Sequence, residues 1–197
     1  MRSISEIVLR AKHWQIFLVT VAFVIAAVSA MLLSFAMAPS GRFPSDIPFL
    51  AVMELFLVSF ALWLWSLGIF LNSLVPRQLR MKTRFFGFSL IYLPLYLPAF
   101  GIFFEVPQLT RNVAVILISW AIIFPLHLFA MFCQFYSLYF VSKSMALAEN
   151  RRPISFGDYV GYFFGLWIFP VGVWIIQPRI NYLYTSVTRS SFIPSTD

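Results

Sequence analysis

Five long apolar stretches constrain this chain more than any other feature of its sequence. A helix needs about 20 mostly apolar residues to cross the hydrocarbon core of a bilayer. Stretches of this kind cover residues 14–37, 47–71, 85–104, 113–141 and 156–176. They lack the alternation of apolar and polar residues that marks the strands of a membrane barrel. The sequence therefore predicts an all-α integral membrane protein, folded as a single-domain bundle of about five transmembrane helices.

Composition excludes the soluble alternatives. Of the 197 residues, 61% are hydrophobic and 11% are charged, with a mean hydropathy of +0.87. A typical soluble domain has about 25% charged residues, and a soluble fold of this size could not bury so many apolar side chains. Soluble enzymes, nucleic-acid-binding modules and disulfide-stabilised domains are therefore excluded. The single cysteine, Cys133, lies in an apolar stretch and is expected to be a small buried residue.

The Lys and Arg residues predict the orientation. Ten of the 14 fall in the amino-terminal tail and in the loops after the second and fourth stretches. The other four, Arg42, Arg111, Arg179 and Arg189, are predicted on the opposite side of the membrane. Because loops rich in Lys and Arg stay in the cytoplasm, the amino terminus is expected there, and five spans would place the carboxyl terminus on the opposite side. The basic loops would face the anionic lipids of the cytoplasmic leaflet.

The last apolar stretch leaves an alternative open. Pro170 and Gly172 interrupt it, and a re-entrant segment there would leave four spans with both termini in the cytoplasm. Ser155 and Asp158 instead fit a capping box at the start of a helix. Since the stretch is also long enough to cross, five spans are favoured.

Two further segments flank the spans. Residues 3–12 combine polar residues with apolar ones at helical spacing, which predicts a short amphipathic helix lying on the membrane surface. Residues 181–197 are predicted to form a polar tail. The loops between the spans are too short to fold as separate domains.

Small residues recur at four-residue steps in two of the stretches. Such a stripe lies on one face of a helix and lets two backbones approach closely, which favours helix association in lipid. We expect these stripes to pack within the chain, with docking of a partner subunit as the alternative. The stripes consist of Gly157, Gly161 and Gly165 in the last stretch and Ala22, Ala26 and Ala30 in the first.

Glu54 and His127 are the ionisable residues expected inside the membrane. If the fourth stretch enters the bilayer near Trp120, both lie about 10 Å below the same surface and could pair. The expectation is a structural pair, or a Glu54 close enough to the interface to reach water, with proton transfer as the alternative. Gln15 and Gln134 are expected to make hydrogen bonds between helices.

Proline is frequent within the apolar stretches. Each proline removes a backbone donor and kinks its helix. We expect these kinks to shape the bundle, with hinges as the alternative, and Tyr92 and Tyr96 could supply hydroxyl groups nearby. The prolines concerned are Pro94, Pro98, Pro125 and Pro170.

The sequence contains no recognisable catalytic motif. It has neither the H-E-x-x-H pattern of metalloproteases nor a phosphate-binding loop, and its two histidines, His13 and His127, are predicted at different depths. No catalytic residue, metal site or cofactor is therefore predicted, and the protein is not expected to be an enzyme.

Five short sequences carry a resemblance to a family. They are KHWQ at 12–15, FPLHLF at 124–129, FYSLYF at 135–140, FPVGVW at 169–174 and QPRIN at 177–181. Together they resemble small polytopic bacterial inner-membrane proteins that have no assigned activity. The resemblance implies a bacterial inner membrane and no particular site residue.

The expected function is therefore non-catalytic. An accessory, assembly or regulatory subunit would bind membrane lipids and a protein partner, or a second copy of the chain, and no nucleic acid. The alternative is a small transporter or channel that uses Glu54, His127 and the proline-kinked third span.

Overall fold

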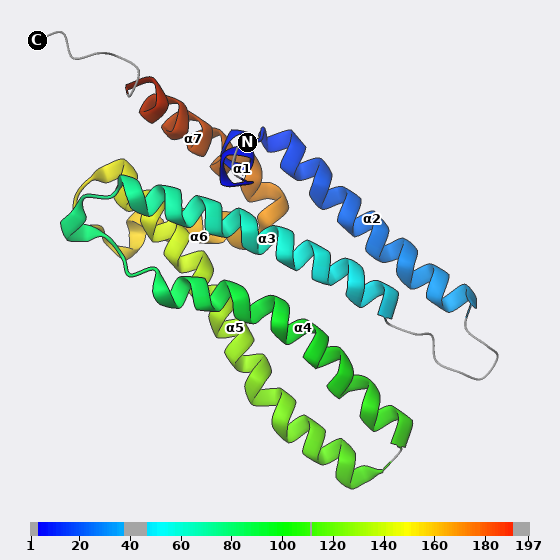
Figure 1. The fold of residues 1–197 in the computed structure, drawn as a ribbon. Coiled ribbons are helices and arrows are strands. Elements are labelled where there is room, and N and C mark those ends of the chain that lie inside the picture. The colour runs from blue at the N-terminus through cyan, green and yellow to red at the C-terminus, as the bar shows by residue number, and fades with distance from the viewer. Residues whose placement is uncertain (1–3, 38–46, 111, 191–197) are drawn as a thin grey trace, which may run out of the picture. The chain divides into compact units, whose positions relative to one another are not determined.

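The computed structural model describes residues 4–37, 47–110 and 112–190, with only the backbone at 4, 103–110 and 189–190. Arg42, Arg111 and the last part of the predicted tail, 191–197, lie outside these residues. The described chain forms helices and no strands (Figure 1). The helices are α1 (Ile4–Arg10), α2 (His13–Met37), α3 (Ile47–Leu74), η1 (Arg77–Leu79), α4 (Arg84–Thr110), α5 (Val113–Asn150), α6 (Phe156–Trp167) and α7 (Phe169–Ser190). The all-α prediction is confirmed.

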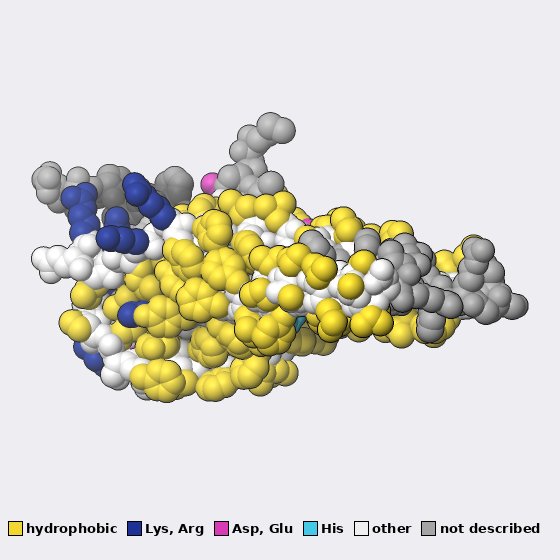
Figure 2. Space-filling model, turned by 90° about the horizontal axis from the view of Figure 1, so that it is seen from below, with side chains coloured by type: hydrophobic (Ala, Val, Ile, Leu, Met, Phe, Trp, Pro, Cys, Tyr) yellow, Lys and Arg dark blue, Asp and Glu magenta, His cyan; other side chains and the backbone are white. Residues whose placement is uncertain are grey.

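Four helices are long and apolar enough to cross a membrane: α2, α3, α4 over Arg84–Ile102, and α5. Many of their large side chains face outward, for example Leu32, Ile91 and Leu117, each at least 64% exposed. Hydrophobic side chains cover most of the face seen in Figure 2. Apolar surface on this scale fits lipid better than water, as expected of an α-helical membrane protein.

Several helices extend beyond the predicted stretches. Helix α5 continues to Asn150, and α7 runs to Ser190 through much of the predicted polar tail. The added part of α5 is rich in Ala, Met, Leu and Glu, which favour helix, and Met145, Ala146 and Leu147 within it are buried. Packing and helix propensity thus extend α5 beyond the end of its apolar stretch.

The packing forms two compact units. The first consists of Met1–Thr20, Leu62–Met81 and Leu138–Asp197, and the second of Val21–Ala61 and Lys82–Ser137. The core of the first unit includes Leu67 of α3, Phe140 of α5, Leu166 of α6 and Ile180 of α7, all buried almost completely.

In the first unit, the loop after α3 is held by side-chain hydrogen bonds. Arg80 donates from Nε to the Val75 carbonyl (2.9 Å) and from Nη2 to the Ser73 carbonyl (2.7 Å). Asn72 exchanges two hydrogen bonds with the backbone of Met81, both 3.0 Å long. The Arg80 guanidinium thereby serves the carbonyls at the end of α3, where a cation also interacts favourably with the helix dipole.

The predicted single helix over residues 156–176 is divided into two. Helix α6 ends at Trp167, and the backbone of the next residue, Ile168 (φ −89°, ψ 61°), leaves the helical region. Pro170 follows in the first turn of α7, where its missing N–H is tolerated, and the Ile168 carbonyl accepts a hydrogen bond from Gly172 N (2.9 Å). Helix α6 has 12 residues and is about 18 Å long, too short to cross a bilayer.

Two glycines bring α6 and α7 together as a helical hairpin. A Cβ atom on Gly172 would lie 1.6 Å from the Gly165 carbonyl oxygen. The two backbones are therefore in direct contact, and a side chain at Gly172 has no room. This contact, together with Pro170, explains why the chain turns at Ile168.

In the second unit, α4 and α5 run side by side in opposite directions (Figure 1). Aromatic rings join them, with ring centroids 4.7 Å apart for Phe85 and Tyr136 and 4.9 Å apart for Tyr92 and Phe129. Cys133 is fully buried in this unit, as the sequence predicts.

Candidate functional site

Glu54 of α3 lies on the wall of a cleft in the second unit. The cleft has a volume of about 340 Å³, and its other lining residues are apolar or glycine: Ile47, Leu50, Ala51, Pro98, Gly101 and Ile102. The Glu54 side chain is half-buried, and its Oε2 atom is buried with no hydrogen-bond partner among the described residues. Leaving a buried acceptor unsatisfied costs about 1–3 kcal/mol, and more when the group is charged. Glu54 thus holds an unsatisfied acceptor beside an apolar cleft.

The shape of the cleft follows from residues of α4. A Cβ atom on Gly101 would lie 2.7 Å from Leu50 Cδ1, so the glycine lets Leu50 approach α4. Pro98 lacks a backbone N–H and leaves the carbonyl of Pro94 without its usual helical donor. Both prolines lie within α4, and Pro98 contributes to the cleft wall.

His127 makes a different contact from the one predicted. Its Nδ1 atom lies 2.7 Å from the Tyr96 hydroxyl. No hydrogen bond or ion pair joins it to Glu54 in the described part of the chain, so the predicted Glu–His pair is not formed. Similar depth was the basis of that prediction, but His127 contacts Tyr96 on α4, whereas Glu54 lies opposite Pro98 and Gly101.

The hydroxyls of Tyr92 and Tyr96 reach the part of α5 around Pro125. The Tyr92 hydroxyl donates to the Leu126 carbonyl (3.2 Å), directly after Pro125. Together with the Tyr96–His127 contact, this forms a polar line between α4 and α5. The His127 side chain is exposed on this line.

Gln15 does not link two helices as predicted. Its Oε1 atom accepts a hydrogen bond from Lys12 N (2.8 Å) and so caps its own helix, α2. Such a hydrogen bond satisfies one of the backbone N–H groups that lack a partner at the start of a helix. Gln134 is half-buried on α5.

Gln177 makes interhelical hydrogen bonds that the sequence does not predict. Its side chain is fully buried in the first unit. Its Nε2 donates to the carbonyls of Ala11 (2.9 Å) and Val8 (3.3 Å) and to Asn181 Oδ1 (3.0 Å), and its Oε1 accepts from Trp63 Nε1 (3.3 Å). One amide thus joins α7 to α3 and to the break between α1 and α2. Gln177 follows the last apolar stretch directly. A polar residue is common at the end of such a stretch, so its position does not predict a buried role.

The predicted glycine stripe is only partly used for packing. A Cβ atom on Gly165 would lie 3.3 Å from Ile176 Cδ1, whereas one on Gly161 would meet nothing within 4 Å, and one on Gly157 would meet only Ser155 Oγ at 4.0 Å.

The alanine stripe of α2 differs along its length. Ala22 and Ala26 are exposed, and Ala30 is half-buried. The buried alanine of this region is Ala27, at 7% exposure, one position away from the predicted stripe.

A charged cluster joins α5, α6 and α7 in the first unit. The Tyr162 hydroxyl donates to Glu149 Oε2 (2.5 Å), Arg179 Nη1 donates to the same hydroxyl, and Arg179 Nη1 lies 3.6 Å from Glu149 Oε2. The five-span prediction places Arg179 on the side opposite Arg151 and Arg152. This assignment is corrected, because the α6–α7 hairpin returns Arg179 to the end of α5.

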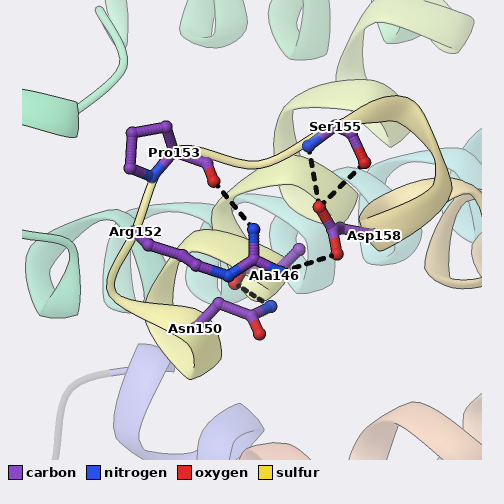
Figure 3. Close-up of polar contacts among 6 residues, drawn as sticks. All are labelled: Ala146, Asn150, Arg152, Pro153, Ser155 and Asp158. Atoms are coloured by element: carbon purple, nitrogen blue, oxygen red, sulfur yellow. Dashed lines mark hydrogen bonds and ion pairs between the residues drawn. The ribbon is translucent and has the colours of Figure 1, made fainter.

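The predicted capping box at Ser155 and Asp158 is confirmed (Figure 3). Asp158 Oδ2 accepts hydrogen bonds from the backbone N (2.7 Å) and the hydroxyl (3.0 Å) of Ser155, and Oδ1 accepts one from Arg152 Nη2 (3.2 Å). The Ser155 hydrogen bonds, and then the Arg152 guanidinium, hold the pKa of the Asp158 carboxyl below its usual range. This carboxylate therefore fixes the start of α6 throughout the neutral pH range.

Comparisons with known proteins do not identify the chain. No protein-family model, no curated protein and no solved structure matches it. The resemblance to small polytopic bacterial proteins therefore stays an expectation from the sequence. Function has to be inferred from the geometry of Glu54 and of the charged cluster.

Proposed function

We propose that this protein is a non-catalytic membrane protein that binds a membrane-embedded partner at the Glu54 cleft. The buried, unpartnered Oε2 atom carries this proposal. Inside a bilayer an ionisable residue is costly and normally finds a partner. Since the rest of the cleft is apolar, the partner supplies a hydrogen-bond donor or a cation on an otherwise apolar segment.

The same proposal includes four spans and a re-entrant segment. Helices α2, α3, α4 and α5 cross the bilayer, and the α6–α7 hairpin enters and leaves on one side. Exposed Trp167, Ile168 and Val171 at the hairpin turn support this arrangement, as do the Arg152–Asp158 and Arg179–Glu149 ion pairs at its base. Asp158 and Ile168 are about 15 Å apart along α6, so the turn would reach the middle of the bilayer.

This topology strengthens the charge asymmetry. With both termini on one side, 12 of the 14 Lys and Arg residues lie on that side, leaving only Arg42 and Arg111 on the other. The positive-inside rule then places both termini in the cytoplasm. A bacterial inner membrane remains the proposed location.

Transport is the second candidate function. It is favoured by the same cleft, because the cleft reaches an intramembrane carboxylate. Binding is preferred for two reasons. The lining around Glu54 is otherwise apolar, and His127 bonds to Tyr96, so no hydrogen-bonded line leads onward from Glu54 within the described residues.

Replacing Glu54 with leucine should strongly weaken partner binding while leaving the protein folded. A hydrogen bond to a charged group contributes about 1.5–3 kcal/mol, so the amount of co-purified partner should fall roughly tenfold or more. The stability of the isolated protein should stay level or rise, because an unsatisfied buried acceptor is removed. The measurement is quantitative mass spectrometry of polymer-extracted native nanodiscs, paired with thermal unfolding.

Leu55→Ala is the matched control, because Leu55 is exposed on the same helix. It should keep the partner. Equal partner recovery with Glu54→Leu and with Leu55→Ala would contradict the proposal, as would proton or ion flux through liposomes that depends on Glu54.

A further inference from the structure

A second depression, in the first unit, lies between the end of α5 and the middle of α7. Its volume is about 500 Å³. Arg151, Arg179, Glu149 and Tyr182 supply its polar lining, and Ala148, Pro178 and Leu183 supply an apolar part. Cationic groups beside apolar ones match a molecule with an anionic group attached to an apolar body.

Arg151 occupies a backbone position that does not favour arginine. Its φ of 51° lies in the left-handed region, and its backbone N donates to the Leu147 carbonyl (2.9 Å), which ends α5. Glycine is the usual residue at such a helix end, and a side chain there costs about 1–2 kcal/mol. The Arg151 side chain is exposed, and its guanidinium makes no hydrogen bond or ion pair with the described residues. Arg151 therefore presents a cationic side chain at a position where the backbone favours glycine.

Arg179 is held in place across the depression. Its Nη1 atom contacts Tyr162 and Glu149, and its guanidinium lies 5.4 Å from the centre of the Tyr162 ring. An arginine has five N–H donors in a planar fork, so these contacts leave donors for a ligand. Glu149 also lines the depression, but its Oε2 atom is engaged by Tyr162 and Arg179. Two arginines against one glutamate leave the lining with a net positive charge.

We propose that this depression binds the phosphate of an anionic phospholipid headgroup. The Arg151 and Arg179 guanidinium groups would pair with the phosphate oxygens, as arginine commonly does. The apolar part of the lining and the Tyr182 ring, which is 75% exposed, would contact the glycerol and the upper acyl chains. The inference rests on the proposed topology, which places the end of α5 at the cytoplasmic leaflet, where anionic lipids are found. It does not depend on the Glu54 cleft.

Lipid-dependent thermal stabilisation of the purified full-length protein in neutral detergent tests this proposal. Short-chain phosphatidylglycerol should raise the unfolding temperature of the wild type. Phosphatidylcholine of equal chain length, and inorganic phosphate at the same concentration, should not. Arg151→Gly should weaken phosphatidylglycerol binding about tenfold, while the lipid-free variant is at least as stable as the wild type, because glycine suits the left-handed backbone.

Two control variants distinguish a site at this depression from a general effect of basic residues or of the Glu54 cleft. Arg77→Gln removes an arginine outside the depression and should leave the lipid effect intact. Glu54→Leu should also retain it, so failure of the cleft proposal would be distinguishable from failure of this one. Equal stabilisation by inorganic phosphate would show a free-anion site instead of a lipid site. An unchanged response in Arg151→Gly, or an equal loss in Arg77→Gln, would overturn the proposal.

Discussion

Replacing Gly172 with alanine should destabilise the protein more than any other single-methyl change in the α6–α7 hairpin. The added Cβ would lie 1.6 Å from the Gly165 carbonyl oxygen. A flexible side chain could move away, but a backbone carbonyl within a helix cannot move without separating the two helices. We expect a loss of about 3 kcal/mol, at the upper end of the usual range for overpacked sites. Thermal unfolding in detergent micelles, followed by far-UV circular dichroism, measures it.

Gly161→Ala is the matched control for this variant. A Cβ atom there would meet nothing within 4 Å, and alanine favours a helix over glycine by about 1 kcal/mol. Gly161→Ala should therefore unfold at the wild-type temperature or above it. If the two variants had equal stability, the close contact between Gly165 and Gly172 would be refuted.

Replacing Gln177 with leucine should have the second largest effect. Leucine is similar in size but can neither donate nor accept a hydrogen bond. The change would remove the acceptor of Trp63 Nε1 and one of the two donors to the Ala11 carbonyl, which also accepts from Asn181 Nδ2. Leaving the buried Trp63 donor unsatisfied costs about 1–3 kcal/mol, so the expected loss is roughly 2 kcal/mol, smaller than that of Gly172→Ala.

The location of the loss distinguishes this prediction from general damage. Gln177 links α7 to the break between α1 and α2, so the backbone amides of α1 should exchange hydrogen much faster in Gln177→Leu. Amide hydrogen exchange read by mass spectrometry measures this. Gln134→Leu, on α5, should leave the exchange of α1 unchanged. Wild-type exchange of α1 in Gln177→Leu would contradict the role assigned to this amide.

Most of the helical framework is predictable from the sequence. Long apolar stretches form helices because a chain in lipid must satisfy its backbone hydrogen bonds within each segment. The division at Ile168 is less accessible. Pro170 and Gly172 are visible in the sequence, but Gly172 also needs Gly165 opposite it, and that contact arises only when α6 and α7 pack.

The candidate site was predictable in its residue type and not in its partners. Glu54 stands out because a carboxylate is unusual in an apolar stretch. The similar predicted depth of Glu54 and His127 in the membrane suggested that they pair. The pairing also depends on which side of α4 each residue faces, and the two residues face different residues of α4. Arg151 gives no signal in the sequence, since its left-handed backbone exists only once α5 ends there.

The side of the membrane reached by the carboxyl terminus tests the four-span topology most directly. Reporters fused after Asp197 would be green fluorescent protein, which fluoresces in the bacterial cytoplasm, and alkaline phosphatase, which is active only outside it. We expect a fluorescent first fusion and an inactive second one, with a phosphatase fusion after Arg111 as the active control. Phosphatase activity and no fluorescence after Asp197 would mean that the last segment crosses completely, and would contradict the re-entrant hairpin.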